Sequence, residues 1–246
     1  MALLNLFIVV SASFLVLAKV SGSGASQQPT YGIKFGTDGK CLAEVNAARL
    51  AAGLSALVQA EAKNTNNRLP NKTLTQEGPN DSWAWMPVCK ALIPSGTYAY
   101  HPVDSPDTVD CNAVVDKWKG AYTNFDGLPP SKKEGEKLYQ NQDNVSFVAL
   151  YNPSKDATAD CRVVTCTKTT PAAERFKATR TTGGETEEGS ALICMTVPDV
   201  LPEEGENAPF TEEQWGQIVT AIEGSASATA PGVVGLALAL LGLSML

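Results

Sequence analysis

The sequence predicts an α+β domain in which an antiparallel sheet lies between helical layers and is braced by disulfides. Amphipathic helical patterns come early in the chain, strand-like segments rich in β-branched residues come late, and one more helical pattern closes it. Six cysteines, an even number, indicate a disulfide framework. The part of the chain between two apolar ends has about 200 residues, which is enough for one domain with a single core.

The N-terminal end has the pattern of a secretory signal peptide. Residues 3–18 form an apolar run, and small residues follow it. We expect residues 1–22 to be removed and residues 23–224 to form a single extracellular domain. The cysteines would then lie in an oxidising compartment, where they pair with each other.

The first helix is expected over residues 39–57. Asp38 or Gly39 can cap it, and Gly53 is placed to end it. The apolar stripe consists of Leu42, Val45, Ala48 and Leu50. A shorter helix is expected at residues 59–67.

Aromatic residues return after a polar stretch, at Trp83 and Trp85, close to Cys89. Paired tryptophans next to a cysteine are typical of packing against a disulfide, with a ligand cradle as the alternative. A third helix is expected over residues 105–123, starting at Ser105 or Asp107.

Three segments have strand-like composition and are bounded by turn residues: 144–151, 161–167 and 190–197. The connection over residues 168–189 is long and polar and is expected to be a mobile excursion. A capping box from Thr211 to Gln214 then opens a final helix that runs to Ile222. Its inner face is predicted to carry Trp215, Ile218, Val219 and Ile222.

The C-terminal end has the pattern of a GPI-anchor signal. Residues 233–246 are apolar, and small residues with a short polar spacer precede them. A membrane span needs about 20 apolar residues and normally has basic residues behind it, so a span is the weaker alternative, as is a buried terminal helix. We expect the lipid to be attached at Gly224, Ser225 or Ala226 and residues 225–246 to be removed.

Three sequons make Asn71, Asn80 and Asn144 candidates for N-glycosylation. Asn144 opens an apolar segment and is the most crowded of the three.

The charge and the residue types exclude several functions. The formal net charge of −7 disfavours binding to nucleic acid. Five lysines gather between residues 117 and 137, either as a local basic patch or as a solvated face: Lys117, Lys119, Lys132, Lys133 and Lys137. The chain has one histidine, His101, and no Cys-x-x-Cys pair, so we predict no metal site and no cofactor. No catalytic motif is present, and we predict no catalytic residues and no enzyme activity.

Several segments resemble the CAP superfamily of cysteine-rich secretory and pathogenesis-related proteins. Residues 44–57 resemble its first helix, with an Asn, an Arg and a closing Gly at Asn46, Arg49 and Gly53. Residues 111–118 resemble its tryptophan-bearing helix, and residues 161–166 with 193–195 resemble its cysteine-bearing hairpin. The resemblance implies a CAP-like α-β-α sandwich. The family's metal tetrad needs two histidines, so a CAP-type metal site is not expected here.

A signal peptide, six cysteines, a CAP-like acidic domain and a GPI signal together are similar to the surface antigen (SAG) family of the apicomplexan parasite Eimeria. This resemblance implies a non-enzymatic glycoprotein on the outer leaflet of the plasma membrane. Its partners would be that membrane through the GPI lipid, the host-cell surface and antibodies. The alternative is a lipid- or sterol-binding carrier of the CAP type, with a groove lined by Trp83, Trp85 and Met86.

Six cysteines permit fifteen pairings. Cys161 and Cys166 are five residues apart, so they face opposite sides of a strand and are not expected to pair with each other. One of them can bridge to Cys194, and the CAP resemblance implies that it is Cys161. We then favour Cys89–Cys166 and Cys41–Cys111 for the remaining two bonds.

Overall fold

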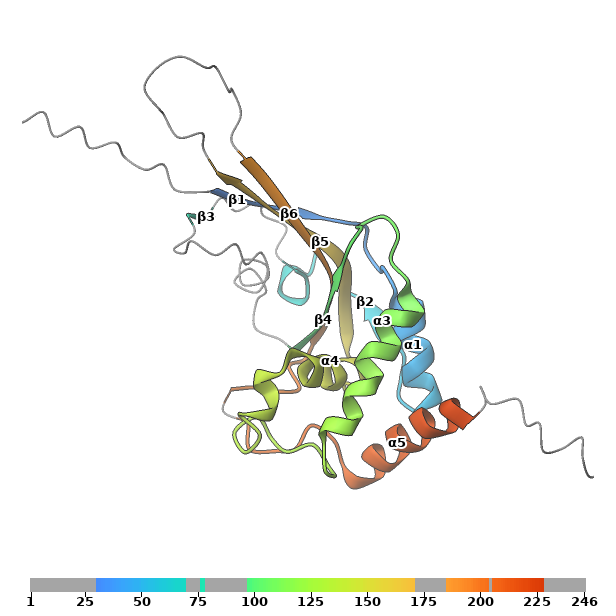
Figure 1. The fold of residues 1–246 in the computed structure, drawn as a ribbon. Coiled ribbons are helices and arrows are strands. Elements are labelled where there is room, and N and C mark those ends of the chain that lie inside the picture. Colours follow the sequence, from blue (N-terminus) through green and yellow to red (C-terminus); the bar gives the residue numbers. More distant parts are fainter. Residues whose placement is uncertain (1–29, 70–75, 78–96, 171–184, 204, 228–246) are drawn as a thin grey trace, which may run out of the picture.

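The computed structural model describes residues 30–69, 76–77, 97–170, 185–203 and 205–227, and its centre is a six-stranded sheet (Figure 1). The strand order is β3-β1-β5-β6-β4, and β2 pairs with β5 in parallel. The strands are β1 Thr30–Phe35, β2 Val58–Gln59, β3 Gln76–Glu77, β4 Thr97–Val103, β5 Thr158–Thr170 and β6 Glu185–Val197. Strands β5 and β6 form a long antiparallel hairpin in the middle of the sheet, with Thr158 opposite Val197 and Thr170 opposite Glu185.

The longer helices gather on one side of the sheet and around its lower end (Figure 1). They are α1 Leu42–Ala51, α3 Cys111–Gly120, α4 Gln142–Leu150 and α5 Glu212–Ser227. Short 3₁₀ turns are η1 Thr65–Asn67, η2 Ala121–Asn124 and η3 Leu138–Gln140. The described residues thus have an α+β fold, as the sequence predicts.

The two faces of the sheet are buried in separate cores. The larger core joins the four helices to one face and includes the fully buried Trp118, Phe147 and Ile218. The smaller core lies on the other face, around Ile193 and Met195, where Leu69 from the segment after η1 packs against it. Among the described residues, therefore, the four longer helices contribute their buried side chains to one face.

The segment 144–151, expected to be a strand, is instead helix α4, and that prediction is wrong. Asn141 caps the helix by accepting a hydrogen bond from the Asp143 N–H at 3.0 Å. Six residues of α4 are buried, on every side of the helix: Asn144, Ser146, Phe147, Val148, Ala149 and Leu150. A helix that is buried all round loses its 3.6-residue periodicity, so its β-branched and aromatic content resembles that of a strand.

The first helix is shorter than expected because Gly53 ends its extension. This glycine has a φ of 73°, in the left-handed region where glycine has no steric penalty. The following loop is fixed by Asn46, whose side chain accepts from Leu57 N–H at 2.7 Å and donates to Leu57 O at 3.0 Å. The helix expected at residues 59–67 was wrong, because these residues begin in β2 and reach η1 only at Thr65.

The third predicted helix exists but begins later, at Cys111. Asp110 is its cap and accepts from Ala113 N–H at 3.0 Å, so Ser105 and Asp107 precede the helix. Residues 121–123, expected to be its last turn, belong to η2 instead, which spans Ala121–Asn124.

The strands at 161–167 and 190–197 are confirmed, although β5 and β6 are each 13 residues long. Part of the connection expected at 168–189 is therefore strand. The capping box is also confirmed: Thr211 N–H donates to Gln214 at 3.0 Å, and Gln214 N–H donates to Thr211 Oγ1 at 3.2 Å. Strands β1 and β4 were not predicted from the sequence.

The apolar segments at both ends of the chain lie outside the described residues. Within the part that the structure describes, no helix has the length and hydrophobicity needed to cross a membrane.

Candidate functional site

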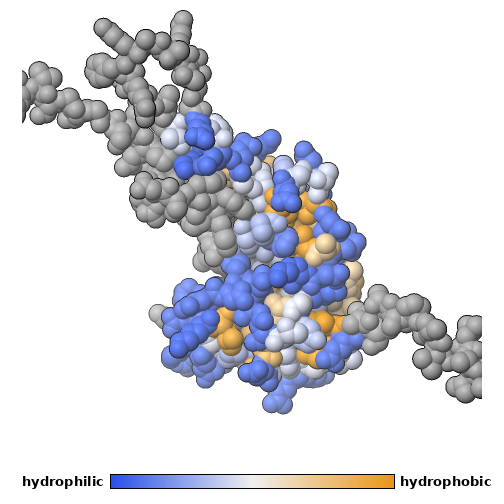
Figure 2. Space-filling view, viewed as in Figure 1, coloured by the Kyte–Doolittle hydropathy of each residue, from blue (hydrophilic) through white to orange (hydrophobic). Residues whose placement is uncertain are grey.

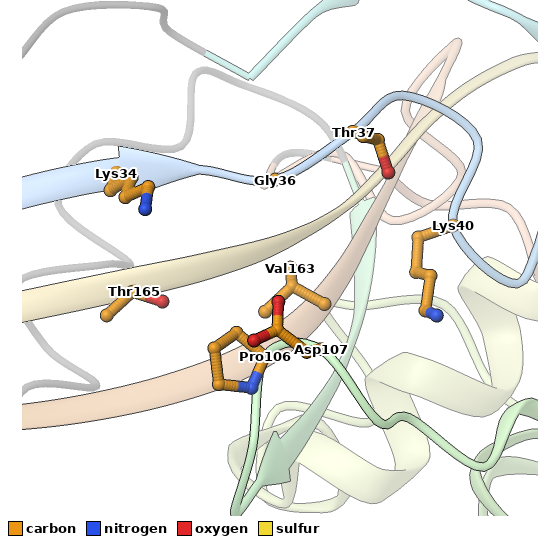
Figure 3. Close-up of a pocket in the computed structure, with 8 residues that line it drawn as sticks. All are labelled: Lys34, Gly36, Thr37, Lys40, Pro106, Asp107, Val163 and Thr165. Carbon is orange, nitrogen blue, oxygen red and sulfur yellow. The ribbon is translucent and has the colours of Figure 1, made fainter.

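The candidate site is a hollow of about 300 Å³ beside the end of β1 (Figure 3). Three segments line it: the end of β1 with the loop that follows, the segment between β4 and α3, and β5. The lining residues are Lys34, Gly36, Thr37, Lys40, Pro106, Asp107, Val163 and Thr165. Five of these eight side chains are polar or charged, so the hollow is suited to a polar ligand.

The sheet register places two of these side chains opposite each other. Lys34 pairs with Thr165, and Gly36 N–H donates to Val163 O at 2.7 Å. A Cβ at Gly36 would lie 3.2 Å from that carbonyl oxygen, so glycine allows the close approach of the loop to β5. The Thr165 hydroxyl is 2.8 Å from the Ser190 hydroxyl on β6.

The loop from Gly36 to Lys40 is held at several points. Lys40 N–H donates to Cys161 O at 3.0 Å. The Cys41–Cys111 disulfide joins the end of the loop to the first residue of α3, with the two Cα atoms 5.1 Å apart. This bond brings the loop close to the segment that carries Asp107.

A buried ionic cluster supports the loop from behind. Asp160 has an exposed fraction of 0%, and its carboxylate accepts two hydrogen bonds from Arg162, at 2.9 and 2.8 Å. Asp38, within the loop, lies 3.1 Å from Arg162 Nε and 2.7 Å from Arg68 Nη2. The Arg162 guanidinium also lies over the Phe35 ring, 5.4 Å from its centroid. These contacts give the loop one fixed position.

The charged side chains of the hollow have no partner in the described part of the chain. Lys34 and Lys40 approach from opposite sides in Figure 3, and the Asp107 carboxylate lies between them in that view. No ion pair or hydrogen bond joins any of these three side chains to another described residue. The hollow therefore presents two ammonium groups and one carboxylate that are all available to a ligand.

The five lysines that cluster in sequence do not form a basic patch. Four of them have acidic partners: Lys117 with Asp143, Lys119 with Asp116, Lys132 with Glu203 and Lys133 with Glu206. The fifth, Lys137, is exposed. Of the two alternatives, the structure thus supports a solvated face in which most charges are neutralised.

His101 belongs to the edge strand β4 and lies near Lys117 of α3 and Asp143 of α4. Burial lowers the pKa of its imidazole, with Asp143 opposing that shift and Lys117 adding to it.

In the part of the chain that the structure describes, one cluster of potential metal ligands occurs, namely Cys41, Glu44 and Cys111. Its two sulfur atoms form a disulfide and are not available as thiolate ligands.

The disulfides of the described residues include two of the expected pairs. Cys41 is bonded to Cys111, and Cys161 is bonded to Cys194 directly across β5 and β6, with a Cα–Cα distance of 4.0 Å. Cys161 lies in the larger core and Cys166 in the smaller one, so they face opposite sides of β5. Cys166 is also disulfide-bonded, but its predicted partner Cys89 lies outside the described residues.

The candidate glycosylation sites have different positions. Asn71 and Asn80 lie outside the described residues. Asn144 is 2% exposed, donates to Leu138 O at 2.8 Å and accepts from Asn124 Nδ2 at 2.6 Å. This packing leaves no space for a glycan at Asn144, the sequon whose apolar surroundings already indicated crowding.

The expected anchor residues belong to the last turns of α5. Gly224, Ser225 and Ala226 are helical and lie just before the end of the described residues at position 227. The residues expected to line a lipid groove, Trp83, Trp85 and Met86, lie outside the described part. The hollow could not be predicted from the sequence, because Lys34, Lys40 and Asp107 show no common motif. The sheet register and a disulfide bring these residues together.

Comparisons with known proteins give one family. A family model described as the sporozoite surface antigen (SAG) protein domain matches residues 37–237. The sporulated oocyst TA4 antigen of Eimeria tenella is 33% identical over 137 residues, which are 55% of this chain and 50% of that antigen. The chain therefore spans about half the length of this relative. No solved structure matches.

Proposed function

The chain belongs to the sporozoite surface antigen (SAG) family, and from this membership we propose that it is a non-enzymatic, GPI-anchored parasite surface protein that contacts host cells and antibodies. The observation that carries the proposal is the family match over residues 37–237, which covers most of the predicted extracellular domain. The expected resemblance to the SAG family is confirmed by this match. Anchoring, attachment and the lack of catalysis are the steps that go beyond it.

The arrangement of the domain supports display from a C-terminal anchor. In Figure 1, α5 and the Thr170–Glu185 end of the β5–β6 hairpin lie at opposite ends of the described structure. A lipid attached at residues 224–226 would place α5 next to the membrane and direct the hairpin away from it. Each 13-residue strand spans about 43 Å at about 3.3 Å per residue. The hairpin is therefore long enough to reach well beyond the helices.

The surface of the described residues supports this proposal. Figure 2 shows a mainly hydrophilic face with small, separate apolar areas. Among the described residues, the exposed large hydrophobic side chains are Leu50, Val58 and Leu128. Scattered single apolar residues of this kind are normal on a soluble domain.

We also propose a CAP-like arrangement for this domain. The three residues that resemble the CAP first helix have structural roles that such a motif needs. Asn46 fixes the loop after α1, Gly53 ends α1, and Arg49 donates hydrogen bonds to the end of α4. These roles support the resemblance without a metal site.

The first test concerns the anchor. Phosphatidylinositol phospholipase C should release the protein from intact expressing cells into the medium, because a GPI lipid is cleaved at its headgroup. A variant in which a transmembrane segment replaces residues 225–246 should stay on the cells and is the control. Retention of the wild-type protein with an intact C-terminal epitope would contradict GPI anchoring.

The second test concerns attachment. Soluble protein spanning residues 26–223, with its disulfides formed, should bind host epithelial cells saturably. Reduced and alkylated protein should lose this binding, since the Cys41–Cys111 and Cys161–Cys194 bonds brace the displayed surface. Binding no greater than that of an unrelated acidic domain of the same size would rule out an attachment role.

A further inference from the structure

We propose that the hollow formed by Lys34, Thr37, Lys40 and Asp107 binds an acidic saccharide, that is, a sugar with a carboxylate or sulfate group. The proposal goes beyond the surface display described above, since ligand binding requires neither the anchor nor host cells. It is carried by the charges, the size and the rigidity of the hollow.

The two lysines supply the recognition of an anion. Six lysines in the described residues form ion pairs: Lys63, Lys117, Lys119, Lys132, Lys133 and Lys168. Lys34 and Lys40 form none, and both line the same hollow. Each ammonium group has three N–H donors, and hydrogen bonds between charged partners are stronger than neutral ones. In a chain with a net charge of −7, two unpaired cations at one point form a local site for an anion.

Asp107 and the threonines favour a ligand with hydroxyl groups over a bare anion. A carboxylate accepts hydrogen bonds but repels a second negative charge at short range. Asp107 therefore suits a ligand that places hydroxyl donors beside its anionic group. The Thr37 hydroxyl can both donate and accept, and the Thr165 hydroxyl, which shares a hydrogen bond with Ser190, can still accept another, which matches the hydroxyl groups of a sugar.

The size of the hollow and its apolar lining residues also favour a saccharide over a bare anion. A hollow of about 300 Å³ is at the small end of ligand pockets, yet it is larger than a single ion requires. Pro106 and Val163 provide aliphatic surface for the C–H face of a sugar ring. Among the described residues, no aromatic side chain lines the hollow, so they offer no platform for stacking a nucleobase.

The hollow is held in place before any ligand arrives. The loop that carries Thr37 and Lys40 is fixed by Asp38, by the Lys40 N–H and by the disulfide at Cys41. A preformed site loses little conformational entropy on binding.

The test is a titration of the purified full chain, solubilised in mild detergent, followed by saturation-transfer NMR of the ligand. The probes are glucuronic acid, glucose 6-sulfate and glucose, with inorganic sulfate as a competitor. The two acidic sugars should bind saturably at low ionic strength and glucose about tenfold more weakly, because it lacks the charge-assisted hydrogen bonds. Inorganic sulfate should compete only at concentrations well above those of the acidic sugars.

Two double variants separate the hollow from bulk charge. Lys34→Gln/Lys40→Gln should weaken binding of the acidic sugars about tenfold or more. The control, Lys137→Gln/Lys155→Gln, removes two exposed lysines that have no ion pair among the described residues and should change the affinity by less than about twofold. Both changes alter the net charge equally, so an equal loss in the two variants would overturn the proposal.

Asp107→Ala separates a saccharide from a bare anion. This variant should bind the acidic sugars more weakly, because their hydroxyls lose an acceptor, while sulfate should compete more strongly, because a repulsive charge is gone. Tighter binding of both would show a simple anion site and overturn the saccharide assignment. Absence of saturable binding by either acidic sugar would overturn the proposal as a whole.

Discussion

Replacement of Asp160 with alanine is expected to lower the free energy of unfolding by about 3–5 kcal/mol. The Asp160 carboxylate is fully buried and accepts from Arg162, from Gln59 at 3.0 Å and from the Leu69 N–H at 2.7 Å. Without it, the side chain of Arg162, which is 5% exposed, keeps a largely buried charge that, among the described residues, only Asp38 can balance. Breaking one partner of a buried ion pair costs more than the pair contributes, because the remaining charge is already desolvated.

Chemical denaturation followed by circular dichroism measures this change. Asp156→Ala is the matched control, since the Asp156 side chain is exposed and forms no hydrogen bond or ion pair with another described residue. We expect the control to change stability by less than about 0.5 kcal/mol. Similar losses in both variants would show that net charge, and not the buried cluster, determines the effect.

A double-variant cycle adds a second, independent measurement. Asp160→Ala and Arg162→Ala together should cost less than the sum of the single changes, by about 0.5–3 kcal/mol. The reason is that removal of both partners leaves no unpaired buried charge between them. Simple additivity would contradict the direct pairing at 2.8 and 2.9 Å.

Replacement of Arg49 with alanine is expected to lower the free energy of unfolding by about 3 kcal/mol or more. Arg49 is 1% exposed and donates to three carbonyl oxygens: Ser55 O at 2.9 Å, Leu150 O at 2.8 Å and Asn152 O at 2.8 Å. Two of these lie at the C-terminal end of α4, where a positive charge is stabilised by the helix dipole. Alanine would leave these carbonyls without this donor and remove the hydrogen bonds from α1 to the end of α4.

The charge state of Arg49 is part of this effect. Burial lowers the pKa of its guanidinium to about 10, with the nearby Tyr151 acting in the opposite direction. This value is well above neutral pH, so the side chain stays protonated and its hydrogen bonds remain charge-assisted.

Thermal and chemical unfolding of three variants test this role. Arg49→Lys should recover part of the stability, because one ammonium group cannot reach all three carbonyls in the geometry of a guanidinium. Leu50→Ala, on the same helix but 60% exposed, should change stability by less than about 0.5 kcal/mol. Full recovery by lysine would show that charge alone matters and that the three-point geometry does not.

The elements that the sequence predicted well are those with local signals. The capping box at Thr211 and Gln214 forms as expected, because both hydrogen bonds connect residues three positions apart. The β5 and β6 strands carry β-branched residues and turn boundaries, and the left-handed Gly53 ends α1. Local stereochemistry decides each of these features.

The elements that it predicted poorly depend on contacts between distant segments. Helix α4 has the composition of a strand, but its position between β4 and the other helices buries every face and allows a helix. Its side chains also cover the edge of β4: Tyr100 N–H donates to Ser146 Oγ at 2.9 Å, and Gln142 donates to Tyr98 O at 3.1 Å. The sequence of either segment alone does not predict that α4 covers the edge of β4.

The sequence by itself determined the α+β class, the disulfide framework, the presence of a single histidine and the resemblance to the SAG family. These depend on residue types, local spacing and the order of motifs. The tertiary structure alone decided that α4 is a helix, that Asn144 is buried, and that the lysines clustered in sequence are mostly neutralised. It also brought Lys34, Lys40 and Asp107 to one hollow. The physical reason is that burial and charge pairing depend on which distant segments meet, and the sheet register and the disulfides set those meetings.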